Sequence, residues 1–492
     1  MVAFFRPVSH LAFFAAFLAL VPPGAIAQET HYTVAAIRCE AGNRDIAVYR
    51  LNLQGGVLST ATLRVDAKPV WMYPSGRILR GSVGERTQFA RLSIPVTDRL
   101  NEALDKNTGS VLDVGDDAEP ETVLKWDSLT SSCASFLVGR NLLRPHPNLR
   151  FGELFLVAAG LQPSGRSFRV GPPLSHTESM KYLIMRLSVE DKDYRPTGAY
   201  PVFQQQYDRH FHILVLWDSA EKTWRHICGS ENERYFFANN VDMLNEKIVF
   251  YRIRNFMSVS ASVMEEAPVI STEGGYEVCQ YDTGTGELRV LTDSGQRWPG
   301  SPGDILWSPD GSRFLFMHAE EWYFGDPVHN EWGGPYVFEV ATKKHYRPTS
   351  KYPIESAICW LPDSVHYLVN RSNLYNPVTG RPRAQEGYFV VHAVTRGEYP
   401  LILVADDPNL GDMIQGLGNQ ARQPSQFAFS PDGALLCFTA FFDQDGATYS
   451  GIFVMRNQPG AAPVLIERSL LRRDYRGIPT LNYHAGPLTW LR

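Results

Sequence analysis

The sequence predicts an all-β fold made of repeated four-stranded sheets, because one turn motif recurs with apolar runs around it. Ser-Pro-Asp-Gly occurs at 308–311 and at 430–433, and a degenerate copy, Leu-Pro-Asp-Ser, occurs at 361–364. An aromatic residue precedes each turn, and a short apolar run follows it. A spacing of about 50–70 residues between copies suits one four-stranded blade with its loops. The repeat therefore predicts a β-propeller.

Aligning further segments on this turn gives the first, inner strand of each blade. Inner strands are expected to start near 71, 126, 174, 241, 307, 360, 429 and 490. Alternating apolar runs bounded by Gly, Asp and Pro indicate the outer hairpins. These hairpins pair 276–281 with 288–291, 336–340 with 345–347, 388–392 with 401–404, and 452–455 with 464–466. We expect eight blades, with seven as the alternative because the copies at 126 and 174 are the most degenerate.

The two ends of the chain are predicted to share one blade. The last inner strand, at 488–491, has no partner strands after it, whereas three strands near the N-terminus, at 32–38, 46–51 and 57–65, belong to no copy. Pairing 488–491 with 32–38 completes a blade and closes the ring. Closure leaves no large open sheet edge.

The aromatic residue before the turn is expected to pack between neighbouring blades. It recurs as Trp71, Trp126, Trp307, Trp360, Phe429 and Trp490. A ligand cage is the alternative interpretation, but a binding site seldom repeats around a ring, whereas packing does. Likewise, the turn residues Asp310, Asp363 and Asp432 are expected to accept hydrogen bonds from their own backbone.

These turns and their spacing resemble the TolB-like β-propeller family, which is related to the non-catalytic domain of prolyl oligopeptidase-like peptidases. The resemblance implies the fold. The peptidases add a hydrolase domain, but no Gly-x-Ser-x-Gly motif occurs in this chain, and its last blade ends at the C-terminus. Bacterial oligogalacturonate lyases use a related propeller with a histidine-centred metal site, and that site maps to no specific residues here.

Other catalytic and metal motifs are missing or incomplete. The sequence holds no His-Glu-x-x-His and no Walker A motif. His210 and His212 share one face of a strand and could bind a metal, but no third ligand is identifiable. Asp443 to Gly446 begins like a calcium loop and lacks the later acidic ligands, which favours a hairpin turn. We assign no catalytic residue, no metal and no cofactor.

The N-terminus is typical of a secretory signal. Arg6 precedes an apolar run at 11–21, and Ala25-Ile26-Ala27 is a cleavage signature. We expect residues 1–27 to be a signal peptide and residues 28–492 to be one propeller domain, periplasmic or secreted. The net charge of −5 offers no basic footprint for nucleic acid, and no later segment is long and apolar enough to span a membrane.

The six cysteines are widely spaced, and none lies in a Cys-x-x-Cys pair. Cys359 and Cys437 fall in apolar strand segments and are expected to be buried thiols. The other four, Cys39, Cys133, Cys228 and Cys279, could form disulfides of undetermined connectivity.

Loop length separates the two ends of the blades. The turns joining first to second and third to fourth strands are short, whereas the other connections, including 318–335 and 405–426, are long. Long loops on a rigid scaffold carry function more often than short turns. One loop gathers acidic and aromatic residues suited to a sugar, a peptide or a cation: Glu320, Glu321, Trp322, Tyr323, Asp326, His329, Glu331 and Trp332. Asp406, Asp407 and Asp412 add acid to the same end.

These observations predict an exported, non-enzymatic propeller that binds a protein or a glycan through its long-loop face. The alternative is a polysaccharide-active enzyme such as a metal-dependent oligogalacturonate-type lyase. The absence of a recognisable catalytic set favours the binding protein.

Overall fold

The computed structural model describes residues 31–40, 43–64, 68–72, 78–83, 86–91, 94–106, 111–113, 126–127, 166–176, 181–191, 210–218, 221, 223–229, 238–244, 246–253, 258–260, 269–271, 276–293, 305–317, 335–348, 355–371, 386–403, 421–470 and 488–491. Within these segments, no helix combines the length and the apolar character that a membrane crossing needs.

These residues form seven sheets of four or five strands, numbered here in chain order. Sheet 1 consists of β31 (Thr489–Leu491), β1 (Tyr32–Glu40), β2 (Asn43–Leu51), β3 (Val57–Arg64) and β7 (Val111–Asp113). Sheet 2 consists of β4 (Lys68–Met72), β5 (Ile78–Val83), β6 (Arg86–Arg91) and β8 (Trp126–Asp127). Sheet 3 consists of β9 (Arg166–His176), β10 (Tyr182–Asp191), β11 (His210–Asp218) and β12 (Thr223–Cys228).

The remaining sheets follow the same order of strands. Sheet 4 consists of β13 (Ala238–Leu244), β14 (Lys247–Ile253), β17 (Tyr276–Asp282) and β18 (Leu288–Asp293). Sheet 5 consists of β19 (Leu306–Trp307), β20 (Arg313–Met317), β21 (Pro335–Glu339) and β22 (Lys344–Tyr346). Sheet 6 consists of β23 (Glu355–Trp360), β24 (His366–Arg371), β25 (Gly387–His392) and β26 (Glu398–Leu403). Sheet 7 consists of β27 (Ala421–Phe429), β28 (Leu435–Gln444), β29 (Ala447–Arg456) and β30 (Val464–Leu470).

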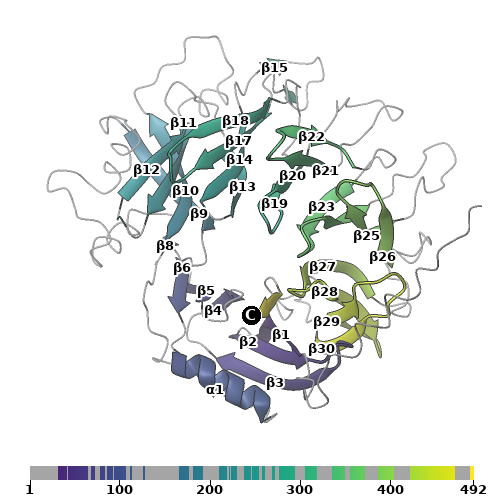
Figure 1. Ribbon diagram of the computed structural model, residues 1–492. Coiled ribbons are helices and arrows are strands. Elements are labelled where there is room, and N and C mark those ends of the chain that lie inside the picture. Colours follow the sequence, from purple (N-terminus) through teal and green to yellow (C-terminus); the bar gives the residue numbers. More distant parts are fainter. Residues whose placement is uncertain are drawn as a thin grey trace, which may run out of the picture.

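Figure 1 shows the seven sheets arranged around a common centre, with the first strand of each sheet nearest to it. The predicted outer hairpins are confirmed as β17–β18, β21–β22, β25–β26 and β29–β30. A separate two-stranded ladder pairs β15 (Ser258–Ser260) with β16 (Val269–Ser271).

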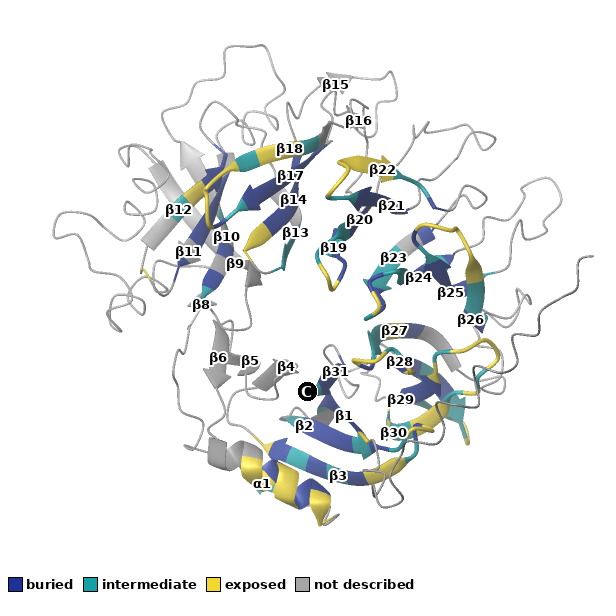
Figure 2. Ribbon diagram, viewed as in Figure 1, coloured by how far each residue is buried: buried dark blue, intermediate teal, exposed yellow. Residues whose placement is uncertain are grey.

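The cores lie between the sheets, so the middle strands are buried on both faces (Figure 2). In β28, Leu435 and Cys437 pack against sheet 1, whereas Leu436 and Phe438 pack against sheet 6. Side chains alternate between the two faces of a strand. A strand covered on both faces therefore reads as a continuous apolar run, as β28 does.

Three of the six repeated aromatic residues are shown to fill the space between neighbouring sheets, as predicted, while the side chains of Trp71 and Trp126 lie outside the described residues. Trp307, Trp360 and Trp490 are buried in the cores between sheets 4 and 5, 5 and 6, and 7 and 1. The indole Nε1 of Trp360 donates to the carbonyl of Leu306 at 2.9 Å, and that of Trp490 donates to the carbonyl of Ala428 at 2.9 Å. The indole thus joins its own inner strand to the inner strand of the preceding sheet.

The predicted pairing of the two chain ends is confirmed. β31 runs antiparallel to β1, with Val34 opposite Trp490 at the centre of the register. The Tyr32 ring packs edge-on against Trp490 with centroids 5.8 Å apart. The Tyr32 hydroxyl also donates a hydrogen bond to Asp432 in the turn of sheet 7. Sheet 1 is therefore fastened to its neighbour by both chain ends.

The copy at Trp126 is not an inner strand, contrary to the prediction. Trp126 lies in β8 at the outer edge of sheet 2, where it pairs with Thr87 of β6. The expectation of eight blades counted this copy as an inner strand. The part of the chain that the structure describes forms seven sheets with four or more strands.

The segment that precedes β8 contains a helix that the sequence analysis missed. α1 (Ile94–Asp105) packs Leu100 and Leu104 against the face of sheet 1 that bears Ile46 and Leu63. After the helix, β7 adds to the outer edge of β3 in parallel. Between β6 and β8 of sheet 2, the chain therefore covers one face of sheet 1 with α1 and extends its outer edge with β7. Sheet 1 is the sheet that contains both chain ends.

Replacing Trp490 by Ala should lower the free energy of unfolding by about 3–5 kcal/mol, because a large buried ring is lost between sheets 7 and 1. Urea unfolding of the two proteins measures the difference. Val394, whose side chain is 52% exposed, provides the control, and Val394→Ala should change the stability by less than about 0.5 kcal/mol. A loss below about 1 kcal/mol for Trp490→Ala would show that this strand does not fasten the ring.

Candidate functional site

The two ends of the sheets differ in the connections that they carry. At the short-turn end, tight turns join the first strand to the second and the third to the fourth, such as β19 to β20 and β21 to β22. At the loop-bearing end, longer segments join the second strand to the third in sheets 3 to 6. In sheets 1, 2 and 7 this connection is a tight turn, contrary to the expectation that all such connections are long. The segments 318–334, 372–385 and 404–420 belong to this end and lie outside the described residues.

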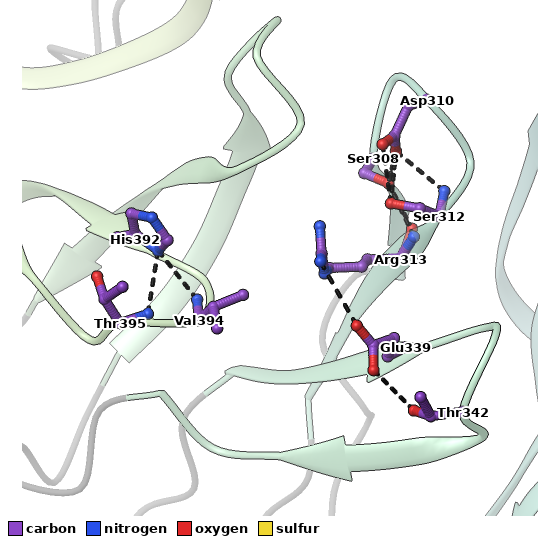
Figure 3. Close-up of polar contacts among 9 residues, drawn as sticks. All are labelled: Ser308, Asp310, Ser312, Arg313, Glu339, Thr342, His392, Val394 and Thr395. Atoms are coloured by element: carbon purple, nitrogen blue, oxygen red, sulfur yellow. Dashed lines mark hydrogen bonds and ion pairs between the residues drawn. The ribbon is translucent and has the colours of Figure 1, made fainter.

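At the short-turn end, the turn aspartates bond their own turns, as predicted. The Asp310 carboxylate accepts the Ser312 amide at 2.9 Å and the Ser308 hydroxyl at 2.7 Å (Figure 3). Burial acts to raise the pKa of Asp310, but these hydrogen bonds hold that pKa below its usual value. Asp363 and Asp432 accept backbone amides in the same way. These carboxylates therefore serve the turns.

Other polar side chains at this end also complete turns. Glu339 accepts the Thr342 hydroxyl at 2.7 Å and lies 3.5 Å from the Arg313 guanidinium (Figure 3). His392 Nδ1 accepts two backbone amides at 3.1 Å, from Val394 and Thr395. The Nδ1 of His392 therefore serves the turn.

At the loop-bearing end of sheet 6, a buried arginine joins two glutamates from different strands. Arg371 ends β24, and its Nη2 lies 2.7 Å from Glu355 of β23 and 2.9 Å from Glu398 of β26. The Arg371 and Glu355 side chains are 2% and 0% exposed. The guanidinium also stacks on the Phe389 ring, 3.9 Å from its centroid. Burial and then the Glu355 charge raise the pKa of the neighbouring Tyr367 well above its usual value, so this phenol stays neutral.

Sheet 4 has a similar buried arginine–glutamate ion pair, also near the end of its second strand. Arg252, near the end of β14, faces Glu277 on β17, and its Nε donates to the carboxylate at 2.7 Å. Both residues are buried. In both sheets the arginine stands where the second strand leaves for a long connection. The pairs therefore fix the points from which the segments 254–275 and 372–385 depart. In the sequence, such an ion pair could be recognised by an arginine at the end of an apolar strand, as in His-Tyr-Leu-Val-Asn-Arg at 366–371.

The predicted binding residues lie outside the described residues. Met317 pairs directly with Pro335, so the roots of their loop are adjacent strand ends in sheet 5. All eight candidates fall between these roots: Glu320, Glu321, Trp322, Tyr323, Asp326, His329, Glu331 and Trp332. Asp406, Asp407 and Asp412 also lie outside. The structure thus positions the base of the loop and leaves the candidates as predictions.

The structure does not show further metal ligands for His210 and His212, the residues that could bind a metal by sequence. The backbone of His210 and His212 forms part of β11, as predicted, while their side chains lie outside the described residues. Among the described residues, no group of three or more His, Cys, Asp and Glu side chains could hold a metal ion. Asp443 lies beside the tight turn between β28 and β29 and accepts the Thr448 hydroxyl at 2.5 Å, as a hairpin predicts.

The described cysteines are thiols. Cys437 is fully buried, as predicted, and burial raises its pKa. Cys359, which was predicted to be buried, is half-buried, and the burial of its thiol raises its pKa to about 12. Cys228 and Cys279, for which disulfides were an alternative, are buried and form none. The side chains of Cys39 and Cys133 lie outside the described residues.

No family model and no curated protein matches the chain. Among solved structures, an oligogalacturonate lyase in complex with manganese matches 88% of this chain and 99% of its own, with a TM-score of 0.41 and 11% identity. TolB from Acinetobacter baumannii matches 94% of this chain and 99% of its own, with a TM-score of 0.30 and 10% identity. A candidate dipeptidyl aminopeptidase IV from Bacteroides ovatus matches 85% of this chain at a TM-score of 0.39 and 10% identity, and this chain spans 49% of its length.

Replacing Arg371 by Met should destabilise the fold by about 3–5 kcal/mol, because it leaves two carboxylates without their buried cation. Chemical unfolding measures the loss. The matched control is Arg289→Ala, since Arg289 forms an exposed ion pair with Glu287, and such pairs are worth about 0–1 kcal/mol. If the two variants lose equal stability, the buried cluster does not hold the loop-bearing end of sheet 6.

Proposed function

We propose that this chain is an exported, closed β-propeller that binds a protein or a glycan through its loop-bearing end, without catalysing a reaction. The observation that carries the proposal is the contrast between the two ends of the sheets. At the short-turn end, Asp310, Glu339 and His392 serve their own turns. At the loop-bearing end, buried ion pairs anchor the roots of long connections. Rigid roots under long loops are a common basis for recognition.

The loop at 318–334 is the proposed centre of recognition. Its sequence holds Trp322, Tyr323 and Trp332 among acidic residues, and its roots are paired strand ends in sheet 5. Aromatic side chains offer large contact area at low conformational cost, and they stack on sugars or pack on protein surfaces. The acidic neighbours favour a neutral or cationic partner over an anionic one.

Export is the second part of the proposal. Cleavage after Ala27 would leave a short N-terminal segment before β1, which starts at Tyr32. The sheet that contains β1 would therefore remain complete in the mature protein.

The mature protein should begin at Gln28. Expression of the full-length chain in a Gram-negative host, followed by intact-mass measurement of the periplasmic and medium fractions, tests this start. Ala25→Asp and Ala27→Asp together should block cleavage, because the recognition site requires small residues. Recovery of the wild-type protein in the cytoplasm with residues 1–27 still attached would contradict the proposal.

Replacing Trp322, Tyr323 and Trp332 together by Ala should abolish capture of a binding partner while the melting temperature stays nearly unchanged. Truncating an aromatic at a binding centre costs roughly 2 kcal/mol or more. The wild type immobilised on beads, exposed to a periplasmic extract and to a glycan array, supplies the reference set of partners. The exposed Val290→Ala on β18 serves as the control, since Val290 is 44% exposed and lies on another sheet. Unchanged capture by the triple variant would move the site away from this loop, and metal-dependent cleavage of a captured glycan would contradict a non-catalytic role.

A further inference from the structure

A patch of exposed apolar side chains lies where sheets 1 and 7 meet, away from the common centre of the sheets. We call it the rim patch, and its members are Leu53, Val57, Leu58, Val464 and Leu465, each between 40 and 46% exposed. Figure 2 shows the exposed start of β3 beside β30. Single exposed apolar side chains are ordinary, whereas a group of them marks a surface that contacts something. The remaining large apolar side chains that are exposed among the described residues are Val111, Val290, Val394 and Leu470.

The two hairpins that carry the rim patch lie against each other. The turn 52–56 joins β2 to β3, and the turn 457–463 joins β29 to β30, so both belong to the short-turn end. Gly55 has a φ of 82°, and a Cβ at this position would lie 2.9 Å from the Cγ1 of Val454 on β29. Val454 pairs directly with Val464. The hairpin of sheet 1 therefore lies on the hairpin of sheet 7, and the patch is one surface built from two sheets.

Polar side chains hold both hairpins in place. The Oδ1 of Asn52 accepts two amides of its own turn, at 2.8 and 2.9 Å. In sheet 7, Asn457 accepts the Tyr399 hydroxyl at 3.1 Å and donates to the Gly433 carbonyl at 3.0 Å. A surface that is already ordered loses little conformational freedom when it binds.

The hairpins of the rim patch carry no charge. Residues 51–63 and 457–466 contain no Asp, Glu, Lys or Arg. In sheets 3 to 6, each turn between the third and fourth strands carries a charged residue: Glu221, Glu287, Lys343 and Arg396, respectively. The rim patch therefore differs from the corresponding surfaces of the other sheets in both charge and apolar exposure.

We propose that the rim patch is the contact between two copies of this chain related by a two-fold axis. Such an interface brings the same surface of both copies together, so that surface must complement itself. An apolar surface without charge does so, whereas a surface with charge of one sign would repel its own copy. A membrane surface is a poorer match, because the hairpins lack the Lys and Arg residues that hold a protein on lipid headgroups.

The dimer goes beyond the proposed function and does not depend on it. Because the patch lies at the short-turn end, its contact leaves the loop-bearing ends of both copies free. The assembly would then present two such ends, and any recognition through them gains from bivalent binding. Five exposed side chains form a small patch compared with a permanent interface, so we expect a dissociation constant of about 1–100 µM.

The test is sedimentation velocity of the full mature chain over about 1–200 µM, a range that brackets the expected dissociation constant. The sedimentation coefficient should rise from that of a monomer to that of a dimer. Leu53→Lys combined with Leu465→Lys should weaken association at least about tenfold, because four ammonium groups would lose water at the contact. Raising the salt concentration should leave the wild-type dimer intact, since screening weakens contacts between charges and this patch has none.

Val290→Lys combined with Val394→Lys is the matched control. These two residues are 44 and 52% exposed and lie on sheets 4 and 6, so the variant adds the same charge outside the patch. It should dimerise as the wild type does, and the melting temperatures of all three proteins should agree. A wild type that stays monomeric over the whole range would overturn the proposal, including one that binds lipid vesicles instead. Equal loss of association in both variants, or dissociation of the wild type by salt, would also overturn it.

Discussion

The burial of each sheet between two neighbours is the constraint on which the rest of this structure depends. Two of the inner strands are too short to be held by backbone pairing alone, since β19 spans two residues and β31 spans three. The buried indole rings of Trp307 and Trp490 add packing against the neighbouring sheet to this short backbone pairing. Trp360 and Trp490 fill the space beside the preceding sheet, and each donates a hydrogen bond to a carbonyl of its inner strand. Removing one sheet would expose an apolar face on each of its two neighbours.

The same constraint explains how the charged residues are distributed. A face covered by a neighbouring sheet can hold a charge only if a partner is buried with it. Arg371 and Arg252 meet this condition, because glutamates from adjacent strands lie within hydrogen-bond distance. Such pairs add little net stability compared with apolar residues of equal size. They do fix geometry, because a guanidinium stacked on Phe389 and bonded to two strands cannot shift without losing several contacts.

The sequence was sufficient to predict the repeat and the outer hairpins, because each depends on local patterns, and the pairing of the chain ends, because the strands there belong to no other copy of the repeat. Glycine after Asp310 and Asp432 marks the turn, and φ values of 70° and 73° show why glycine stands there. The prediction for Trp126 was wrong, since a tryptophan beside an aspartate resembles the start of a repeat and only pairing with β6 reveals an outer strand. The helix α1 and the Arg371 cluster were missed because both depend on contacts between segments that are far apart in the sequence. The loop candidates remain predictions from composition, and the structure describes only the strand ends that carry them.

Ser364 and Gln426 show two different reasons for a left-handed residue that is not glycine. Ser364 replaces the turn glycine of the repeat, at a φ of 58°, and its hydroxyl accepts the amide of Asp310 from the turn of the neighbouring sheet at 3.0 Å. The strain there is offset by a bond between sheets that glycine could not make. Gln426 sits inside a strand, where the Tyr388 hydroxyl bonds the Pro424 carbonyl and the Thr439 hydroxyl bonds the Ser425 carbonyl. The architecture explains the serine completely. For the glutamine it explains the backbone conformation, which the contacts on Pro424 and Ser425 hold in place.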